Sequence, residues 1–124
     1  MRFKTERTAI RVLQDAIDFL EVRETRMIRD VIPALLLELR EGLAAVEYET
    51  YNLGQRLMML KKAQRHLLKA RDLADERRTG KKYISMEDSM DLLKVRHFCL
   101  AGALFIGIGM TDLRDGVQYP PQAA

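Results

Sequence analysis

Histidine and cysteine, two residue types often used in acid–base and metal chemistry, are few in this sequence. The chain has two histidines, His66 and His97, and one cysteine, Cys99. Neither histidine has a carboxylate three residues before it, so the Glu-x-x-His pair of di-iron helical bundles is absent. The sequence also has no glycine loop for phosphate, no Ser–His–Asp order and no zinc-ligand spacing. It therefore predicts a protein with no enzymatic activity, no cofactor and no metal.

These residues have structural explanations. His97 falls on an apolar helical seam, so we expect a hydrogen-bonded core histidine, whereas His66 lies in "KKAQRHLLK" and belongs to a solvated basic face. Cys99 lies in the most apolar stretch and is expected to be a small buried side chain, because a reactive thiol needs a polar or electropositive neighbourhood. Four glutamates lack a clustered set of partners and are expected to hydrate the surface: Glu38, Glu41, Glu47 and Glu49.

Positive charge is the one uneven feature of the chain. Residues 55–82 hold ten Lys and Arg against three acids, while residues 30–54 hold five acids against one Arg. A basic stripe over residues 56–82 could neutralise nucleic-acid phosphates, or it could be solvated or meet the acidic half of a second copy. No aromatic residue interleaves with it to stack bases. The candidate contacts are Lys61, Lys62, Arg65, Lys69, Arg77, Arg78, Lys81 and Lys82.

The stretch "HFCLAGALFIGIGM", residues 97–110, is apolar for about 13 residues. At 1.5 Å per residue this reaches only about 20 Å, whereas a membrane-spanning helix needs about 20 apolar residues. We therefore predict no membrane span, although peripheral membrane contact stays open. No apolar region with a small-residue cleavage site follows the basic N-terminus, which favours a cytoplasmic location.

Helices must position these side chains. Among 124 residues there are seven Met, no Trp and only three Pro, and Gly is absent before residue 42. Such a composition suits helix packing and lacks the turn residues that an all-β protein requires. An all-α fold is predicted, with a single helical domain over residues 1–116 and a flexible C-terminal tail over 117–124.

Apolar spacing and capping residues predict the helix bounds. A first helix is expected over 6–31, capped by Thr5 or Thr8, and a last helix over 85–109, with Ser85 as its cap. Between them the apolar seam keeps its phase from 34 to 79, which favours one long central helix. A break near Gly54 would instead divide that segment into two helices.

The two versions place the apolar stretch differently. Long helical hairpins around a continuous central helix leave the middle of a two-layer rod uncovered, so a second copy must cover it. An up-down four-helix bundle buries the stretch internally. The expected interface residues are Leu57, Leu60, Leu100, Ala103, Leu104, Gly107 and Ile108.

Function is therefore expected to be association. We expect a small adaptor, scaffold or inhibitor that forms a homodimer or higher homo-oligomer and binds another protein through helical faces. The alternative is a protein that binds the nucleic-acid backbone through the basic stripe.

Overall fold

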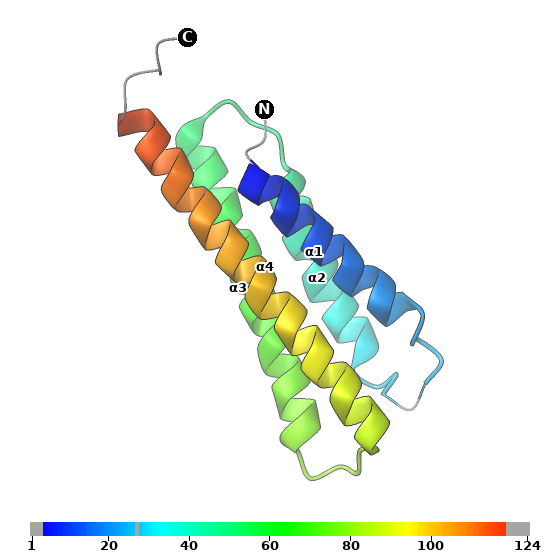
Figure 1. The fold of residues 1–124 in the computed structure, drawn as a ribbon. Helices are drawn as coiled ribbons and strands as arrows, with labels where there is room; N and C mark the ends of the chain where they lie inside the picture. The colour runs from blue at the N-terminus through cyan, green and yellow to red at the C-terminus, as the bar shows by residue number, and fades with distance from the viewer. Residues whose placement is uncertain (1–3, 27, 119–124) are drawn as a thin grey trace.

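The computed structural model describes residues 4–26 and 28–118, which form four helices and no strand (Figure 1). The helices are α1 (Lys4–Glu21), α2 (Ile32–Glu47), α3 (Leu53–Thr79) and α4 (Met86–Gln118). The all-α prediction is confirmed, in its four-helix-bundle form. Most of the tail predicted over 117–124 lies outside the described residues, but the backbone of 117 and 118 belongs to α4.

The four helices form an antiparallel ring. Helices that follow one another in the chain pack together, and α4 closes the ring by packing on α1 (Figure 1). The start of α1, the α2–α3 loop and the end of α4 lie at one end of the bundle. The core is aliphatic, and its largest fully buried apolar side chains are Leu13, Leu20, Ile28, Ile32, Leu35, Leu36, Leu39, Leu60, Leu67, Leu92 and Ile106.

The first helix is shorter than predicted. It ends at Glu21, and a series of turns carries the chain to α2. In these turns Arg23 and Arg26 each reach Asp91 of α4 at 3.1 Å, while Ile28 is fully buried. If α1 continued as a helix through these residues, Arg23 and Arg26 would not both be directed to Asp91 near the start of α4. The predicted caps are also wrong, because Thr5 and Thr8 lie inside α1.

The long central helix is the second correction. The chain leaves helical geometry at residues 48–52 and turns back on itself. Asn52 begins α3, because its side-chain oxygen accepts a hydrogen bond from the Gln55 backbone amide at 3.0 Å. Thr50 supports the loop by accepting a hydrogen bond from the Asn52 backbone amide at 3.1 Å. This is the N-cap arrangement that satisfies free amides at a helix start.

The last helix extends beyond its predicted end at 109. Gly107 and Gly109 lie inside α4, and after them Met110 and Leu113 are still buried in the core. The expected cap is present at the other end of the helix, where Ser85 Oγ accepts a hydrogen bond from the Asp88 amide at 3.1 Å.

Two glycines let α4 approach its neighbours closely. A Cβ atom on Gly102 would lie 3.0 Å from Leu67 and 3.1 Å from Leu13, and one on Gly109 would lie 3.4 Å from Thr5 Oγ1. In the sequence, glycines spaced as these are could equally leave room for the backbone of a second copy of the chain. The structure instead uses both for packing within the bundle.

Candidate interaction surfaces

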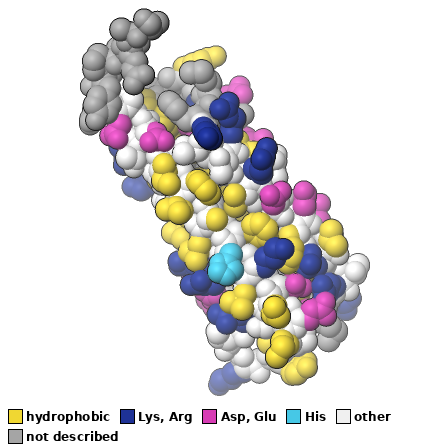
Figure 2. Space-filling model, viewed as in Figure 1, with side chains coloured by type: hydrophobic (Ala, Val, Ile, Leu, Met, Phe, Trp, Pro, Cys, Tyr) yellow, Lys and Arg dark blue, Asp and Glu magenta, His cyan; other side chains and the backbone are white. Residues whose placement is uncertain are grey.

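The outward side of α4 is the most apolar exposed helix face in the described chain. Leu104 is 61% exposed, Ile108 40% and Met90 63%. Leu104 and Ile108 are one turn apart and Met90 is about four turns before Leu104, so all three lie on one side of the helix. Hydrophobic side chains accordingly run along the course of α4 in the space-filling view (Figure 2). We call this surface the α4 outer face, and it comprises Met90, Lys94, His97, Ala101, Leu104, Ile108, Thr111 and Asp115.

A groove of about 330 Å³ runs beside this face, between α3 and α4. Its floor is fixed by Gln64 of α3, whose side-chain amide donates a hydrogen bond to the Ala103 carbonyl at 3.0 Å. Gly107 keeps the groove open, because a Cβ atom there would lie 3.3 Å from the Gln64 amide nitrogen. Leu104 and Ile108 form its rim.

The structure brings together only some of the predicted interface residues. Ala103, Leu104, Gly107 and Ile108 line the same groove. Three others belong mainly to the bundle: Leu60 is 1% exposed, and Leu57 and Leu100 are partly buried. Burial within the chain therefore limits the candidate contacts on α4 to the outward residues.

His97 is not a core histidine. It is exposed on the α4 outer face, one helical turn from Lys94 and Ala101. The inward positions of α4 are instead filled by Val95 and Cys99, both fully buried. Burial raises the pKa of the Cys99 thiol to about 12, which keeps it protonated and unreactive, as its apolar surroundings predicted.

The predicted basic face of α3 is present at its surface. Lys61, Lys62, Arg65 and Lys69 are all exposed, and we call these four residues the α3 basic face. Within residues 4–26 and 28–118, only Lys69 of the four has an ion-pair partner, Glu38, at 3.4 Å.

The cations near the end of α3 differ from this face because they are bound. Arg77 and Lys82 approach Asp30 at 3.0 and 3.7 Å, and Arg78 approaches Asp75 at 3.6 Å. Lys81 is exposed and has no ion pair in the described part of the chain. Arg77 and Lys82 therefore join the end of α3 and the loop after it to the α1–α2 turn, whereas the Arg78 ion pair lies within α3.

Glu38 is the residue that sequence reasoning assigned least correctly. It is 7% exposed, and its carboxylate lies 2.7 Å from His66 Nδ1 and 3.4 Å from Lys69 Nζ. Burial acts to raise the pKa of Glu38, but the hydrogen bonds from His66 and Lys69 lower it, and the net shift is downward. His66 therefore joins α3 to α2 and is not simply solvated. The sequence did contain a signal for the burial of Glu38. This residue lies three residues after Leu35 and four before Gly42, so it falls on the same inward side of the helix.

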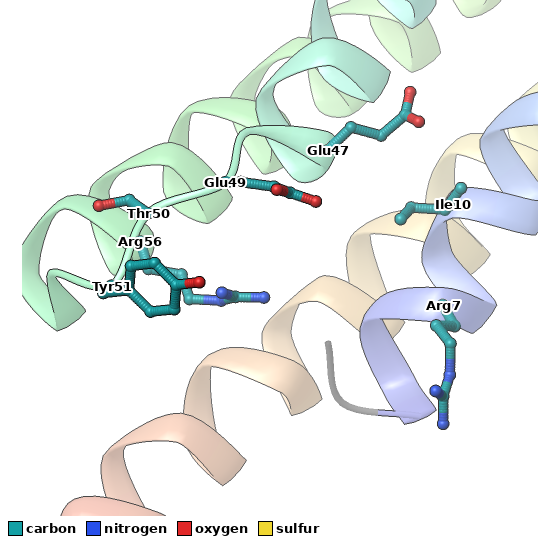
Figure 3. A pocket seen from close by; sticks show the side chains of 7 residues that line it. All are labelled: Arg7, Ile10, Glu47, Glu49, Thr50, Tyr51 and Arg56. Carbon is teal, nitrogen blue, oxygen red and sulfur yellow. The ribbon is translucent and has the colours of Figure 1, made fainter. Parts of the chain in front are cut away.

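A second buried carboxylate lies near a cavity of about 700 Å³ at the end of the bundle where α1 starts. Figure 3 shows the side chains that line this cavity. Glu6 is 1% exposed and accepts two hydrogen bonds from Arg56, at 2.5 and 3.3 Å. Arg56 points toward the cavity between α1 and the α2–α3 loop. Glu6 and Arg56 satisfy each other's charge, and their hydrogen bonds join α1 to α3. We therefore assign no ligand to the cavity. The lining residues are Arg7, Ile10, Glu47, Glu49, Thr50, Tyr51 and Arg56.

The described residues contain no cluster of three or more His, Cys, Asp or Glu that could hold a metal ion. By length and composition alone, α4 could cross a membrane over Met86–Gly116, with a mean hydropathy of 1.5 in its most apolar window. Core helices of soluble bundles share this property, so the absence of a membrane span stays a prediction.

Comparison with protein-family models, with curated proteins and with solved structures gives no match to this chain.

Proposed function

We propose that this protein is a non-enzymatic helical interaction protein that associates with itself through the α4 outer face. The observation that carries this proposal is the exposure of Leu104 and Ile108 at 61% and 40%, beside an open groove. Covering such side chains contributes roughly 25 cal/mol for each Å² of apolar surface removed from water. Groups of exposed apolar residues of this kind are typical of contact surfaces.

The basis for self-association differs from the one that the sequence provided. The sequence argument required a rod with an uncovered middle, whereas the bundle covers its own middle. The support for association now comes from a smaller surface, the α4 outer face. Gln64, Ala103 and Gly107 line the groove beside this face. The same surface suits an apolar helix of another protein, which would compete with the second copy and give the chain an adaptor or inhibitor role.

Sedimentation at tens of micromolar tests the proposal. We expect a dimer or higher oligomer, and we expect Leu104→Glu to raise its dissociation constant at least tenfold because the charge would be buried at the interface. Leu37→Glu is the matched control, since Leu37 of α2 is 58% exposed but lies on another face. A monomeric wild type, or equal effects of the two variants, would refute self-association through α4.

A specific observation also supports a second function. Lys61, Lys62 and Arg65 are exposed on consecutive turns of α3 and have no ion pair within the described residues. Such cations can contact nucleic-acid phosphates without reading sequence.

A mobility shift tests the second function. If it holds, wild-type protein should bind duplex at about 50 mM salt and lose that binding steeply by about 200 mM. Replacing Lys61, Lys62 and Arg65 with Gln should abolish binding, whereas replacing Lys4, Arg7 and Arg11 of α1 with Gln should leave most of it. Absence of a shift at about 50 mM salt would exclude this function.

A further inference from the structure

The α4 outer face has a lysine and a histidine toward its start and aspartates toward its end, so Lys94 and the aspartates carry opposite charges. Lys94 and His97 are exposed toward its start, while Asp112 and Asp115 are exposed toward its end. Lys94 has no carboxylate partner in the described structure and lies 4.9 Å from the centre of the Phe19 ring. Asp112 accepts one long hydrogen bond, 3.5 Å from Thr5. Leu104 and Ile108 lie between these two ends, whereas Met90 lies before Lys94.

Helix geometry places the charged and apolar groups in line. At 100° per residue, positions 97, 101, 104, 108 and 115 fall on one side of α4, and Lys94 and Asp112 lie together at one edge of it. A second copy of this helix would therefore meet charges of both signs, on either side of the same apolar centre. Its direction decides which charges face each other.

We infer that two copies of the chain pair through α4 in antiparallel orientation, about a two-fold axis that passes between Leu104 and Ile108. This inference rests on the self-association proposed above. The axis places Leu104 against Ile108 of the second copy, Ala101 against Thr111, and His97 against Asp115. Lys94 then lies within one helical turn of that same Asp115. Two-fold symmetry repeats every contact, so both charged ends are complementary.

A parallel pair would have the opposite electrostatics. Lys94 would face Lys94, and Asp115 would face Asp115, at both ends of the contact. Exposed ion pairs contribute little affinity individually. They do select orientation, because like charges held opposite each other disfavour the wrong arrangement. The apolar centre therefore supplies the attraction, and the charged ends set the direction.

Cysteine cross-linking distinguishes the two orientations. In the antiparallel dimer His97 lies about 27 Å along the helix from its own symmetry mate, from 1.5 Å per residue, and so does Asp115. We expect neither His97→Cys nor Asp115→Cys to cross-link to itself, whereas an equimolar mixture should form a disulfide-linked dimer under mild oxidation. Cys99 is fully buried and serves as a silent background thiol.

Charge exchange supplies an independent readout by sedimentation. Lys94→Glu should weaken the dimer at least threefold, because it places a second negative charge near Asp115 of the other copy. Adding Asp115→Lys to that variant should restore wild-type affinity, because the two positions then carry opposite charges again, with their signs exchanged. In a parallel dimer neither change would follow this order.

The outcomes separate this inference from the proposal on which it rests. If wild-type protein dimerises but each single-cysteine variant cross-links to itself, the antiparallel arrangement is overturned while self-association survives. A monomeric wild type overturns both.

Discussion

α3 and α4 are adjacent helices with opposite outward faces. The exposed side of α3 carries Lys61, Lys62, Arg65 and Lys69, whereas the exposed side of α4 carries Leu104, Ile108 and other apolar groups. Their inward sides are alike, since both bury small and aliphatic residues in one core.

The difference shows that solvation accounts for the four cations of α3, whereas burial within one chain does not account for the exposed Leu104 and Ile108 of α4. Charged residues outside a helix need no cover, because water solvates them. Covering exposed aliphatic residues such as Leu104 and Ile108 is favourable because it removes apolar surface from water. On its outward side α3 exposes mainly charge, with Met58 60% exposed near its start, whereas α4 exposes Leu104 and Ile108 one helical turn apart.

The comparison is tested most strongly by two isoleucines of α4. Ile106 is fully buried and Ile108 is 40% exposed. We expect Ile106→Ala to reduce the free energy of unfolding by about 2–5 kcal/mol, because it leaves a core cavity. Ile108→Ala should cost less than about 1 kcal/mol in dilute protein, measured by urea unfolding. Equal losses in the free energy of unfolding would show that the outward side of α4 stabilises the monomer as much as the core side does.

A smaller effect is expected at the link between α3 and α2. Because the pKa of Glu38 is lower in the folded chain, its ionised form stabilises the fold above the unfolded-state pKa. That contribution is lost as pH falls through the folded-state pKa. Glu38→Gln should therefore cost about 1–2 kcal/mol at neutral pH and flatten the loss of stability on acidification, measured by denaturant unfolding across pH.

The control for that experiment is Glu41→Gln, an exposed change on the same helix. It should leave both the stability at neutral pH and its acid dependence nearly unchanged. If Glu38→Gln behaves in the same way, the contacts with His66 and Lys69 do not contribute to folding.

The smallest effect should come from the unpaired cations of α3. Replacing Lys61, Lys62 and Arg65 with Gln keeps helix propensity and removes only solvated charges. We expect the free energy of unfolding, measured in urea, to change by less than about 0.5 kcal/mol. A larger loss would mean that the outward side of α3 is tied to the fold as closely as Glu38 is.

Local signals predicted part of this structure correctly. Helical periodicity, the scarcity of Pro and the absence of Gly before residue 42 indicated an all-α chain. Ser85 marked the start of α4, and its side chain makes the expected capping hydrogen bond. Cys99 was assigned to the core because all its neighbours in sequence are apolar, and it is fully buried. Each of these features depends on residues within a few positions of each other.

Features that depend on distant partners were missed. Glu38 and Glu6 are buried because His66 and Arg56, from another helix, satisfy them. The break before α3 was ambiguous for a different reason. Adjacent leucines fit more than one helical phase, so the apolar spacing looked continuous across residues 48–52, which form a loop. His97 was misplaced in the same way, since Cys99 and Val95 occupy the inward positions near it.

The ring arrangement also bears on the order in which the chain folds. Three of the four helix contacts join neighbours along the chain, and only α1 with α4 brings distant segments together. Loop closure costs more entropy for distant segments, so we expect the α3–α4 hairpin to form early and the docking of α1 to come last.

Amides of α1 should then exchange with solvent through partial opening, while those of α3 exchange only through global unfolding. Until α1 docks, the side of α4 that contains Gly102 and Gly109 is uncovered, so slow docking would favour misassembly with other chains.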